Sequence, residues 1–275
     1  MARPKNGVAK EVVKPYYSEP GIEIYAGDAR HIMPHLPPVD LIVTDPPYGL
    51  DYNNGDLASQ WEKCFGGDVE RMKPRPIAND GEADAMQLFE DFLSIASGKL
   101  LKGGCCCCCC CCCGGGPKPL FAKWTLLMDK YIGFKQAVVW DKGGLGMGIH
   151  YRRNYEFVLI AQKGAPARVW NGGNTTPNVW RIPKIIPRED QHPTEKPLAL
   201  AIKIIEIHSN PGDLILDPFM GKGWAVIAAK MTGRRAIGIE WEREHLESAV
   251  RKVRNFEVLP LNQPTQEKQE QGELC

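Results

Sequence analysis

The sequence lacks the features that mark membrane-spanning and secreted proteins. No uninterrupted apolar run approaches the ~20 residues that a membrane-spanning helix needs. The opening stretch, Met1 to Lys14, is mixed and basic and contains no apolar core of a signal peptide. We therefore expect a soluble, cytoplasmic protein with no membrane partner.

An excess of charge of one sign is also missing. The chain of 275 residues has 34 lysines and arginines against 33 aspartates and glutamates, which gives a net charge of +1. This balance disfavours a protein that simply coats nucleic acid, because bulk charge would not attract the phosphates. If nucleic acid binds, local basic clusters must hold it. An enzyme with one focused cleft is compatible with the composition.

Spaced cysteines are absent, although the chain contains 11 cysteines. Nine of them form one run, Cys105 to Cys113, and the other two are Cys64 and Cys275. Adjacent cysteines pair badly, and a metal site needs spaced ligands. Free cysteine behaves as a small hydrophobe, so we interpret the run as a buried central strand and predict no metal site.

Strands and helices alternate from Gly21 onward. Apolar periodicity predicts strands over 22–25, 39–44, 105–113, 136–140, 155–162, 213–217 and 235–240. It predicts helices over 29–36, 84–101, 121–131, 198–208, 224–232 and 242–255, with Gly103 and Gly104 ending the second of them. Only 136–140 and 155–162 form an expected hairpin. The pattern predicts an α/β fold with a mostly parallel, doubly wound sheet and one antiparallel hairpin strand.

Three kinds of segment flank or interrupt this pattern. We expect a flexible arm over residues 1–20, one domain over 21–258 and a disordered tail over 259–275. Residues near 50–80 and 164–191 are polar and show no clear period. Long irregular segments in a compact domain are usually functional, so we interpret these two as recognition loops.

The first motif, Asp45-Pro46-Pro47-Tyr48, follows a predicted buried strand. Two prolines cannot continue a ladder, so the strand must stop there. Ligands bind at the carboxyl edge of open α/β sheets. There a carboxylate that accepts an N–H bond would assist a weakly nucleophilic base amine, and an aromatic ring would stack on a flipped base. The competing interpretation is a strand-to-loop corner with a capping aspartate.

The second motif runs from Asp217 to Gly223 and also ends a predicted strand. Glycines let the backbone pass close to a ligand, and a helix N-terminus favours a carboxylate. An acid at the end of the next strand, Glu240, is suited to bind ribose hydroxyls. A glycine pair alone also serves as a tight turn, but this combination predicts a nucleoside-type cofactor.

The third motif is His192-Pro193-Thr194-Glu195-Lys196-Pro197, just before a predicted helix. Thr194 would be a good helix N-cap, so a purely structural role is as plausible as a functional one.

In this order the three stretches resemble the amino-methyltransferases of DNA that modify N6 of adenine or N4 of cytosine, specifically the permuted β class. The resemblance covers roughly residues 21–255 and includes "GIEIYAGDARHIMPHLPPVDLIVTDPPY", "VWDKG" and "HPTEKP". It implies a circularly permuted, Rossmann-like methyltransferase fold with S-adenosylmethionine as cofactor. The reaction would be direct transfer of methyl from a sulfonium to a base nitrogen. The cysteine run follows no Pro-Cys pattern, which disfavours C5 methylation of cytosine.

The resemblance also implies roles for individual residues. The catalytic group would comprise Asp45, Pro46, Pro47 and Tyr48, which bind the target amine and stack on the base. The cofactor group would comprise Asp28, Thr194, Lys196, Asp217, Phe219, Gly221, Gly223 and Glu240. Within it, Glu240 takes the ribose hydroxyls, Asp28 lies near the adenine, and Thr194 and Lys196 hold the methionine carboxylate.

The chain departs from the family at two positions, because Lys222 and Trp224 stand where Ser and Thr are usual. Trp224 is bulky for a first helical turn beside a ligand, which questions cofactor affinity rather than the fold. These substitutions leave open a catalytically inactive, DNA-binding regulator on the same fold.

Basic residues that flank the catalytic motif and the hairpin are the candidate contacts to double-stranded DNA. They are Arg71, Lys73, Arg75, Arg152, Arg153, Arg168, Arg181, Lys184 and Arg188. Solvated surface charge is the alternative for about half of them. Phosphate contacts position a protein without giving sequence, so the recognition loops would read the site.

The sequence therefore predicts a site-specific DNA (adenine-N6) methyltransferase of bacterial or phage-infected cells. Aspartate at the first motif position favours adenine in this family, and N4-cytosine is the alternative. Related motifs also occur in enzymes that act on RNA or on a protein amide. A companion restriction endonuclease, as in restriction-modification, and a homodimer are the further partners that the resemblance leaves open.

Overall fold

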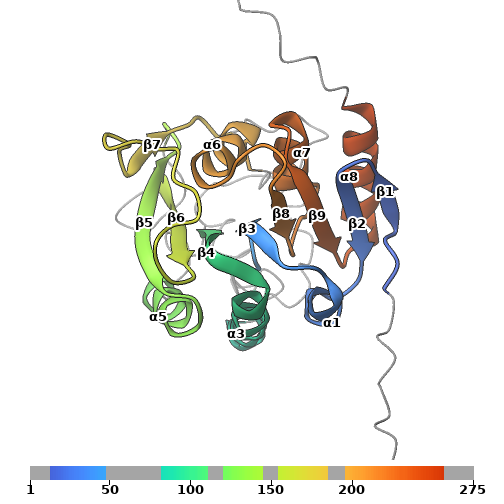
Figure 1. Ribbon diagram of the computed structural model, residues 1–275, viewed down its shortest axis with the longest axis horizontal. Helices are drawn as coiled ribbons and strands as arrows, with labels where there is room; N and C mark the ends of the chain where they lie inside the picture. Colours follow the sequence, from blue (N-terminus) through green and yellow to red (C-terminus); the bar gives the residue numbers. More distant parts are fainter. Residues whose placement is uncertain (1–12, 48–81, 111–119, 145–153, 185–195, 257–275) are drawn as a thin grey trace, which may run out of the picture.

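The computed structural model describes residues 13–47, 82–110, 120–144, 154–184 and 196–256 (Figure 1). The described strands form one nine-stranded sheet in the order β1-β2-β9-β8-β3-β4-β6-β5-β7. Their bounds are β1 Tyr17–Glu19, β2 Ile22–Ala26, β3 Val39–Thr44, β4 Leu100–Cys110, β5 Phe134–Asp141, β6 Tyr155–Gln162, β7 Val179–Arg181, β8 Leu214–Asp217 and β9 Arg235–Glu240. The predicted α/β class is confirmed.

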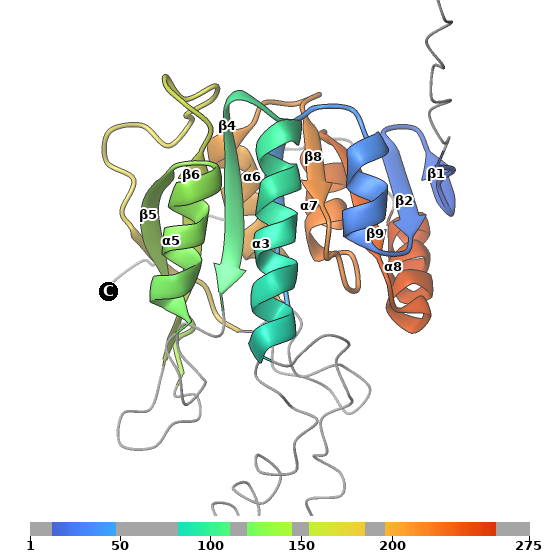
Figure 2. The ribbon, with the colours of Figure 1, turned by 90° about the horizontal axis from the view of Figure 1, so that it is seen from below.

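Helices cover both faces of this sheet (Figure 2). One layer holds α1 (Ala29–Ile32), the 3-10 turn η1 (Met33–His35), α3 (Glu82–Lys99) and α5 (Phe121–Tyr131). The opposite layer holds α6 (Leu198–His208), α7 (Trp224–Met231) and α8 (Arg243–Asn255). Each layer packs on its own hydrophobic cluster, so the central strands are buried on both sides. None of the helices in the described ranges is long and apolar enough to cross a bilayer.

Cys105 to Cys109 of the cysteine run lie in the interior of the sheet, as predicted. Side chains of a strand alternate between faces. Cys105, Cys107 and Cys109 accordingly join the cluster under α6–α8, while Cys106 and Cys108 join the cluster under α1–α5. All five are buried and none of them forms a disulfide, and burial raises the pKa of the Cys105 thiol to about 12. Such thiols are inert, and the part of the chain that the structure describes contains no cluster of metal-ligating side chains.

The parallel strands place their carboxyl ends at one edge of the sheet. β2 pairs with β9, β9 with β8, β8 with β3 and β3 with β4, all in parallel. Five strands therefore end side by side, and the segments after β2, β3, β8 and β9 emerge next to one another. This edge, called the carboxyl edge below, is where the sheet topology positions a site.

Two elements differ from the sequence predictions, whereas the expected hairpin of β5 and β6 is confirmed, with β6 antiparallel to both β4 and β5. Tyr17–Glu19 forms the edge strand β1, antiparallel to β2, so the predicted flexible arm over 1–20 is wrong at these residues. Val179–Arg181 forms β7 inside the predicted irregular segment 164–191 and pairs with β5. Short strands at sheet edges carry little periodicity, which is why the sequence did not show them.

The predicted helix stop at Gly103 and Gly104 is also wrong, because both glycines lie inside β4. Gly103 has a positive φ of 78°, and its backbone N–H donates to Lys163 while its carbonyl accepts from Arg168. A Cβ on Gly104 would lie 2.6 Å from the Asp40 carbonyl oxygen. The glycines therefore permit a close backbone crossing within the sheet rather than a helix end.

Gly238 in β9 provides the tightest packing of α7 and its preceding turn against the sheet. A Cβ there would lie 2.4 Å from Met220 Sδ and 2.9 Å from Val226 Cγ2. Real Cβ atoms essentially never show contacts this short, so a larger residue must displace the Met220 and Val226 side chains.

We expect Gly238→Ala to lower the free energy of unfolding by about 1–3 kcal/mol, because it overpacks this junction. Urea denaturation measures the change. Gly98→Ala is the matched control: it lies in α3, a Cβ there meets nothing within 4 Å, and the helix should gain up to ~1 kcal/mol. Equal effects of the two substitutions would contradict the packing argument.

Candidate active site at the carboxyl edge

Four acidic side chains follow four adjacent parallel strands at the carboxyl edge. Asp28 comes two residues after β2, Glu240 ends β9, Asp217 ends β8 and Asp45 directly follows β3. Electrostatic interactions with both Asp45 and Glu240 raise the pKa of Asp217, after the larger effect of burial. The three acids at the ends of β3, β8 and β9 are therefore close neighbours, although they come from motifs far apart in the sequence.

Asp45 forms a short ion pair with Lys196. The Lys196 Nζ atom lies 2.6 Å from Asp45 Oδ2, and the lysine side chain is only 4% exposed. Lys196 begins the segment that leads into α6, so the third motif reaches across to the first. The resemblance implied a bond from Lys196 to the cofactor carboxylate; the structure instead places its ammonium on Asp45, and a cofactor contact stays a prediction.

This ion pair continues into a row of alternating charges. Lys196 Nζ also lies 3.9 Å from Glu156 Oε2, and Lys142 Nζ lies 2.9 Å from Glu156 Oε1. Lys142 follows β5 and Glu156 lies in β6, so the hairpin contributes directly to the site. The sequence pointed to Lys142 only as part of "VWDKG" and gave no signal for Glu156, because no motif includes that residue. The row fixes Lys196 from two sides and thereby orients Asp45.

Asp217 is buried at the centre of the edge. Its Oδ1 atom accepts hydrogen bonds from Thr44 Oγ1 at 2.8 Å and from the Phe219 N–H at 3.2 Å, while Oδ2 has no partner among the described residues. Burial raises the pKa of this carboxyl to about 8. Asp217 is therefore protonated in much of the neutral range and can donate a hydrogen bond. Thr44, which the sequence analysis did not single out, ties the end of β3 to the end of β8.

Glu240 accepts backbone N–H groups from the turn over 218–223, called the glycine turn below, and from the segment that follows β9. Its Oε2 accepts from Gly221 at 2.8 Å and its Oε1 from Glu242 at 2.8 Å. Burial raises the pKa of Glu240 to about 7, while these N–H bonds oppose the shift. The side chain is 9% exposed and is preorganised as an acceptor at the end of β9.

The glycine turn leaves room beside the acids. Gly221 has φ +52° and a Cβ there would meet nothing within 4 Å, whereas Gly223, at φ +88°, approaches Ala249 of α8. Phe219 packs edge-on against Phe92 of α3, with ring centroids 5.5 Å apart. The open space at Gly221 lies where the second motif predicts a ligand.

Trp224 does not line this space as a bulky first-turn residue would. It is 6% exposed and belongs to the hydrophobic cluster under α6–α8. Its Nε1 has no hydrogen-bond partner among the described residues. Trp224 therefore does not obstruct a cofactor at the glycine turn, because its ring is part of the core.

Asp28 caps α1. It accepts the Arg30 backbone N–H at 2.8 Å and pairs with the Arg30 guanidinium at 2.6 Å. The hydrogen bond from Arg30 holds the pKa of this carboxyl below its usual value. Gly27 N–H donates to the Glu240 carbonyl, which places Asp28 at the carboxyl edge beside β9.

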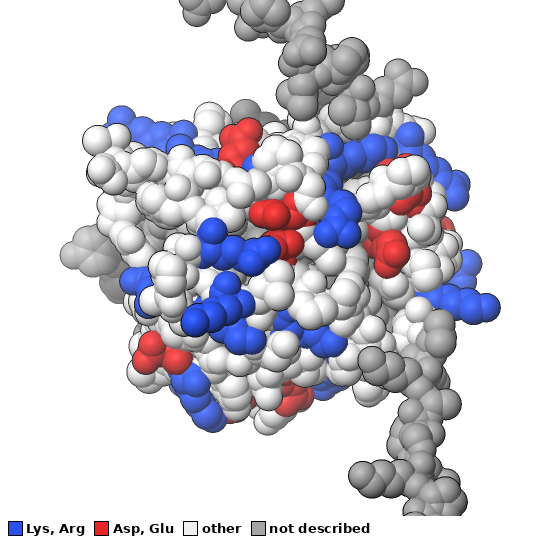
Figure 3. Space-filling model, viewed as in Figure 1, with Lys and Arg blue, Asp and Glu red and all other residues white. Residues whose placement is uncertain are grey.

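The described basic candidates lie at two different edges. Arg181 ends β7 opposite Asp141, the last residue of β5, at the carboxyl edge; it lies 3.7 Å from the Asp141 carboxylate and is 87% exposed. Lys184 follows it and bonds through its backbone N–H to the Lys142 carbonyl. Arg168 instead bonds to Asp40 at the amino end of β3, at 2.7 Å, and its DNA contact stays a prediction. Basic and acidic side chains lie interspersed on the face of the molecule that Figure 3 shows. Arg71, Lys73, Arg75, Arg152, Arg153, Arg188, Tyr48 and Thr194 lie outside the described residues.

The edge can thus perform two tasks. The Asp45 carboxylate, fixed by Lys196 and flanked by the Pro46–Pro47 corner, can accept an N–H from a bound amine. Glu240, Asp217 and the space at Gly221 can hold a polar molecule next to it. The edge can therefore hold two polar reactants next to each other.

Comparison with protein families identifies the same region. A model of a DNA methylase family matches residues 39–251, which include the described acids at the ends of β3, β8 and β9. The Type II methyltransferase M2.MboI of Moraxella bovis is 26% identical over 277 residues, covering 90% of this chain and 93% of that protein. The DNA adenine methyltransferase YhdJ of Escherichia coli K12 is 27% identical and covers 84% of this chain and 82% of that one.

Solved structures agree with the fold. The crystal structure of the M1.HpyAVI-SAM complex has a TM-score of 0.60 and is 26% identical in sequence. The match covers 86% of this chain and 100% of that chain. The PvuII DNA methyltransferase, which is cytosine-N4-specific, has a TM-score of 0.68 at 17% identity and covers 89% of each chain. At 17% identity, the likeness to the PvuII enzyme shows a shared fold alone.

The raised pKa of Asp217 predicts a pH-dependent stability that one substitution removes. The folded-state pKa of about 8 lies above the ordinary 3.8, so the native protein holds this proton more tightly than the unfolded chain. Its contribution is complete at low pH and is lost as the pH rises toward 8. Asp217→Asn mimics the protonated acid. Urea unfolding between about pH 5 and pH 8 should show wild type losing stability relative to this variant; parallel curves would contradict the burial argument.

Proposed function

The chain belongs to the DNA methylase family, and from this membership and the geometry of the carboxyl edge we propose that it transfers methyl from S-adenosylmethionine to the N6 amine of adenine in double-stranded DNA. The observation that carries the proposal is the juxtaposition at the ends of β3, β8 and β9. There an oriented Asp45 lies beside Asp217, Glu240 and the space at Gly221.

The cofactor site is proposed on the glycine turn and the end of β9. Glu240 presents carboxylate oxygens that suit ribose hydroxyls, and the buried Asp217, its electrostatic neighbour, belongs to the proposed set. The described residues fit such a group, because a Cβ on Gly221 meets nothing within 4 Å. When bound, S-adenosylmethionine supplies an electrophilic methyl group on a sulfonium. Asp28, Phe219, Gly223 and Lys196 complete the proposed set, together with Thr194 of the third motif.

The target amine is proposed to bind at Asp45. An exocyclic amine conjugated into a base has little free lone-pair density, so it reacts only if charge can build up on nitrogen. A carboxylate that accepts one N–H favours this, and the preorganised pair with Lys196 keeps Asp45 in place before the base arrives. Because the amine is otherwise used in base pairing, the base must leave the stack, and Tyr48 is the proposed stacking partner.

Adenine is the proposed base rather than cytosine. YhdJ is named a DNA adenine methyltransferase, and it aligns with 84% of this chain. The likeness to the cytosine-N4-specific PvuII enzyme is one of fold and carries no argument about the base. Aspartate at the first motif position agrees with adenine.

Partners follow from the same relatives. M2.MboI carries a Type II designation, so a companion restriction endonuclease is part of the proposal, as is a cytoplasmic location. A homodimer stays a prediction from the resemblance alone. The inactive regulator is disfavoured by the buried position of Trp224, which leaves the space at Gly221 unobstructed.

Expression in methylation-free bacteria tests the reaction, with long-read sequencing of their DNA as the readout. We expect N6-methyladenine at one recurring sequence motif. Asp45→Asn should lower methyl transfer by roughly 10²–10³-fold, because the amide accepts an N–H less strongly, while S-adenosylmethionine binding by calorimetry persists. N4-methylcytosine in place of N6-methyladenine would contradict the choice of base. An Asp45→Asn enzyme as active as wild type would contradict the site.

Arg181 and Lys184 are proposed to contact DNA phosphates. Replacing both with alanine should raise the KM for DNA and reduce the salt slope of binding by roughly 1 per lost contact, with little change in kcat. The control is Arg235→Ala, an exposed arginine at the amino end of β9 on the opposite edge. If the control weakens DNA binding as much as the double variant, the placement of DNA at the carboxyl edge fails.

A further inference from the structure

The hairpin of β5 and β6 places one acidic side chain, Glu156, on the face of the sheet that α6 covers. Glu156 lies directly opposite Trp140 in the pairing of the two strands, so both side chains point to the same face. Trp140 and Val158, the next residue of β6 on that face, belong to the hydrophobic cluster under α6–α8. The hairpin therefore directs Glu156 toward the segment that leads into α6, where Lys196 lies.

Lys142 holds Glu156 in one orientation. Its backbone N–H donates to the Asn154 carbonyl at 2.8 Å, so the end of the hairpin fixes its main chain. Its Nζ donates to Glu156 Oε1 at 2.9 Å, and the two side chains are only 16% and 12% exposed. An ion pair that is largely removed from water is screened little by salt. The other carboxylate oxygen of Glu156, Oε2, thereby stays on the side of Lys196.

The Lys196 ammonium lies between two carboxylates. Its Nζ is 2.6 Å from Asp45 Oδ2 and 3.9 Å from Glu156 Oε2. Charges attract strongly where little water is present, so an ammonium that faced Asp45 alone would neutralise this carboxylate and weaken it as a hydrogen-bond acceptor. A second carboxylate shares the charge of the ammonium. Glu156 therefore affects both the position of Lys196 and the strength of Asp45 as an acceptor.

We propose that Glu156 is a positioning residue of the methyl transfer, which acts through Lys196 to keep Asp45 oriented and strongly accepting for the target amine. The inference rests on the proposed function, because it assigns Glu156 a part in that reaction. Lys142 has the same role one contact further from the amine, since it holds Glu156. The β5–β6 hairpin thus contributes to the reaction although it carries none of the three motifs.

Glu156→Gln tests the proposal in the full-length protein, because it removes the charge and keeps the size of the side chain. We expect kcat for methyl transfer to DNA to fall roughly tenfold, since small displacements of a reacting group are costly. The KM for DNA and the Kd for S-adenosylmethionine should stay within about twofold of wild type. Glu156→Asp keeps the charge and should retain more activity than Glu156→Gln. Lys142→Met should lower kcat by a smaller factor than Glu156→Gln.

A double-mutant cycle shows whether Glu156 acts through Lys196. In a Lys196→Met background the connection to Asp45 is already broken. Glu156→Gln should therefore lower kcat by less than about twofold in this background. If the separate losses of the two variants multiply fully, Glu156 acts by another route and the proposal fails.

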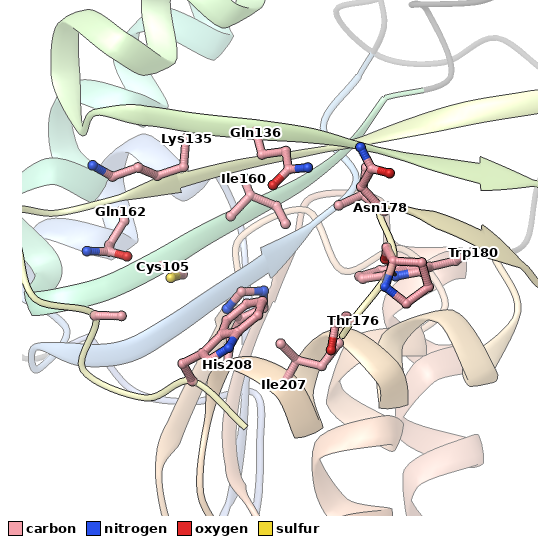
Figure 4. Close-up of a pocket in the computed structure, with 14 residues that line it drawn as sticks. Cys105, Lys135, Gln136, Ile160, Gln162, Thr176, Asn178, Trp180, Ile207 and His208 are labelled. Atoms are coloured by element: carbon pink, nitrogen blue, oxygen red, sulfur yellow. Dashed lines mark hydrogen bonds between the residues drawn. The ribbon is translucent and has the colours of Figure 1, made fainter. Parts of the chain in front are cut away.

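Two control variants separate this role from a general disturbance of charge or of the hairpin. Glu90 pairs with Lys130 at 2.8 Å on the more exposed surface between α3 and α5, so Glu90→Gln should leave kcat unchanged. Gln136 lies at the other end of the hairpin, among the residues that line a cavity of about 130 Å³ beside the end of α6 (Figure 4). It precedes Lys142 by about 20 Å along the strand, and Gln136→Ala should also leave kcat unchanged.

Two kinetic outcomes would overturn the proposal. The first is a Glu156→Gln enzyme with the kcat of wild type. The second is a raised Kd for S-adenosylmethionine at unchanged kcat, which would mean that Glu156 acts on the cofactor rather than on Asp45.

The Lys196 ammonium signal in ¹H–¹⁵N spectra provides a readout that does not depend on methyl transfer. Glu156→Gln should shift this signal and Glu90→Gln should not. An unchanged signal in Glu156→Gln would contradict the contact itself. A wild-type protein that methylates no DNA would contradict the proposed function and this inference with it, whereas an active wild type with an unimpaired Glu156→Gln variant contradicts the inference alone.

Discussion

The parallel pairing of β3 with β8 is the constraint on which the site depends. Its register, with Leu41 opposite Ile215 and Ile42 opposite Leu216, ends the two strands within one residue of each other. Asp45 and Asp217 are 172 residues apart in the chain yet lie at adjacent strand ends because of this pairing. The Thr44–Asp217 hydrogen bond locks the two ends together. A shift of this register by one residue would turn every side chain of β3 to the opposite face and would separate the site residues.

Placing several acids side by side in a buried edge creates repulsion, which the protein resolves differently for each acid. Asp45 is paired with a buried ammonium, Glu240 accepts backbone N–H groups, and Asp217 holds its proton. Titratable groups whose surroundings separate their protonation states are typical of sites with distinct chemical roles. Here the separation leaves one oriented carboxylate for an amine and two further groups for a polar ligand.

The sequence predicted the α/β class, the bounds of α5 and α6, and the placement of two motifs and of Glu240 at strand ends, because long periodic segments and proline or glycine stops are local signals. It did not predict the Lys196–Asp45 pair, since contacts across 151 residues depend on strand order. Strand order also placed Arg168 at the amino end of β3 and Glu156 beside Lys196. The positions of Gly103 and Gly104 inside β4 depended on a backbone crossing that no local pattern encodes.

The central claim is that one cleft at the carboxyl edge holds both reactants. A crystal structure with S-adenosylhomocysteine and a duplex containing the target sequence tests it most directly. The account predicts the ribose on Glu240, and the target amine on Asp45 with its nitrogen positioned where a sulfonium methyl would lie about 3–3.5 Å away. A cofactor bound at any other place, or a target base that lies far from Asp45, would contradict the account.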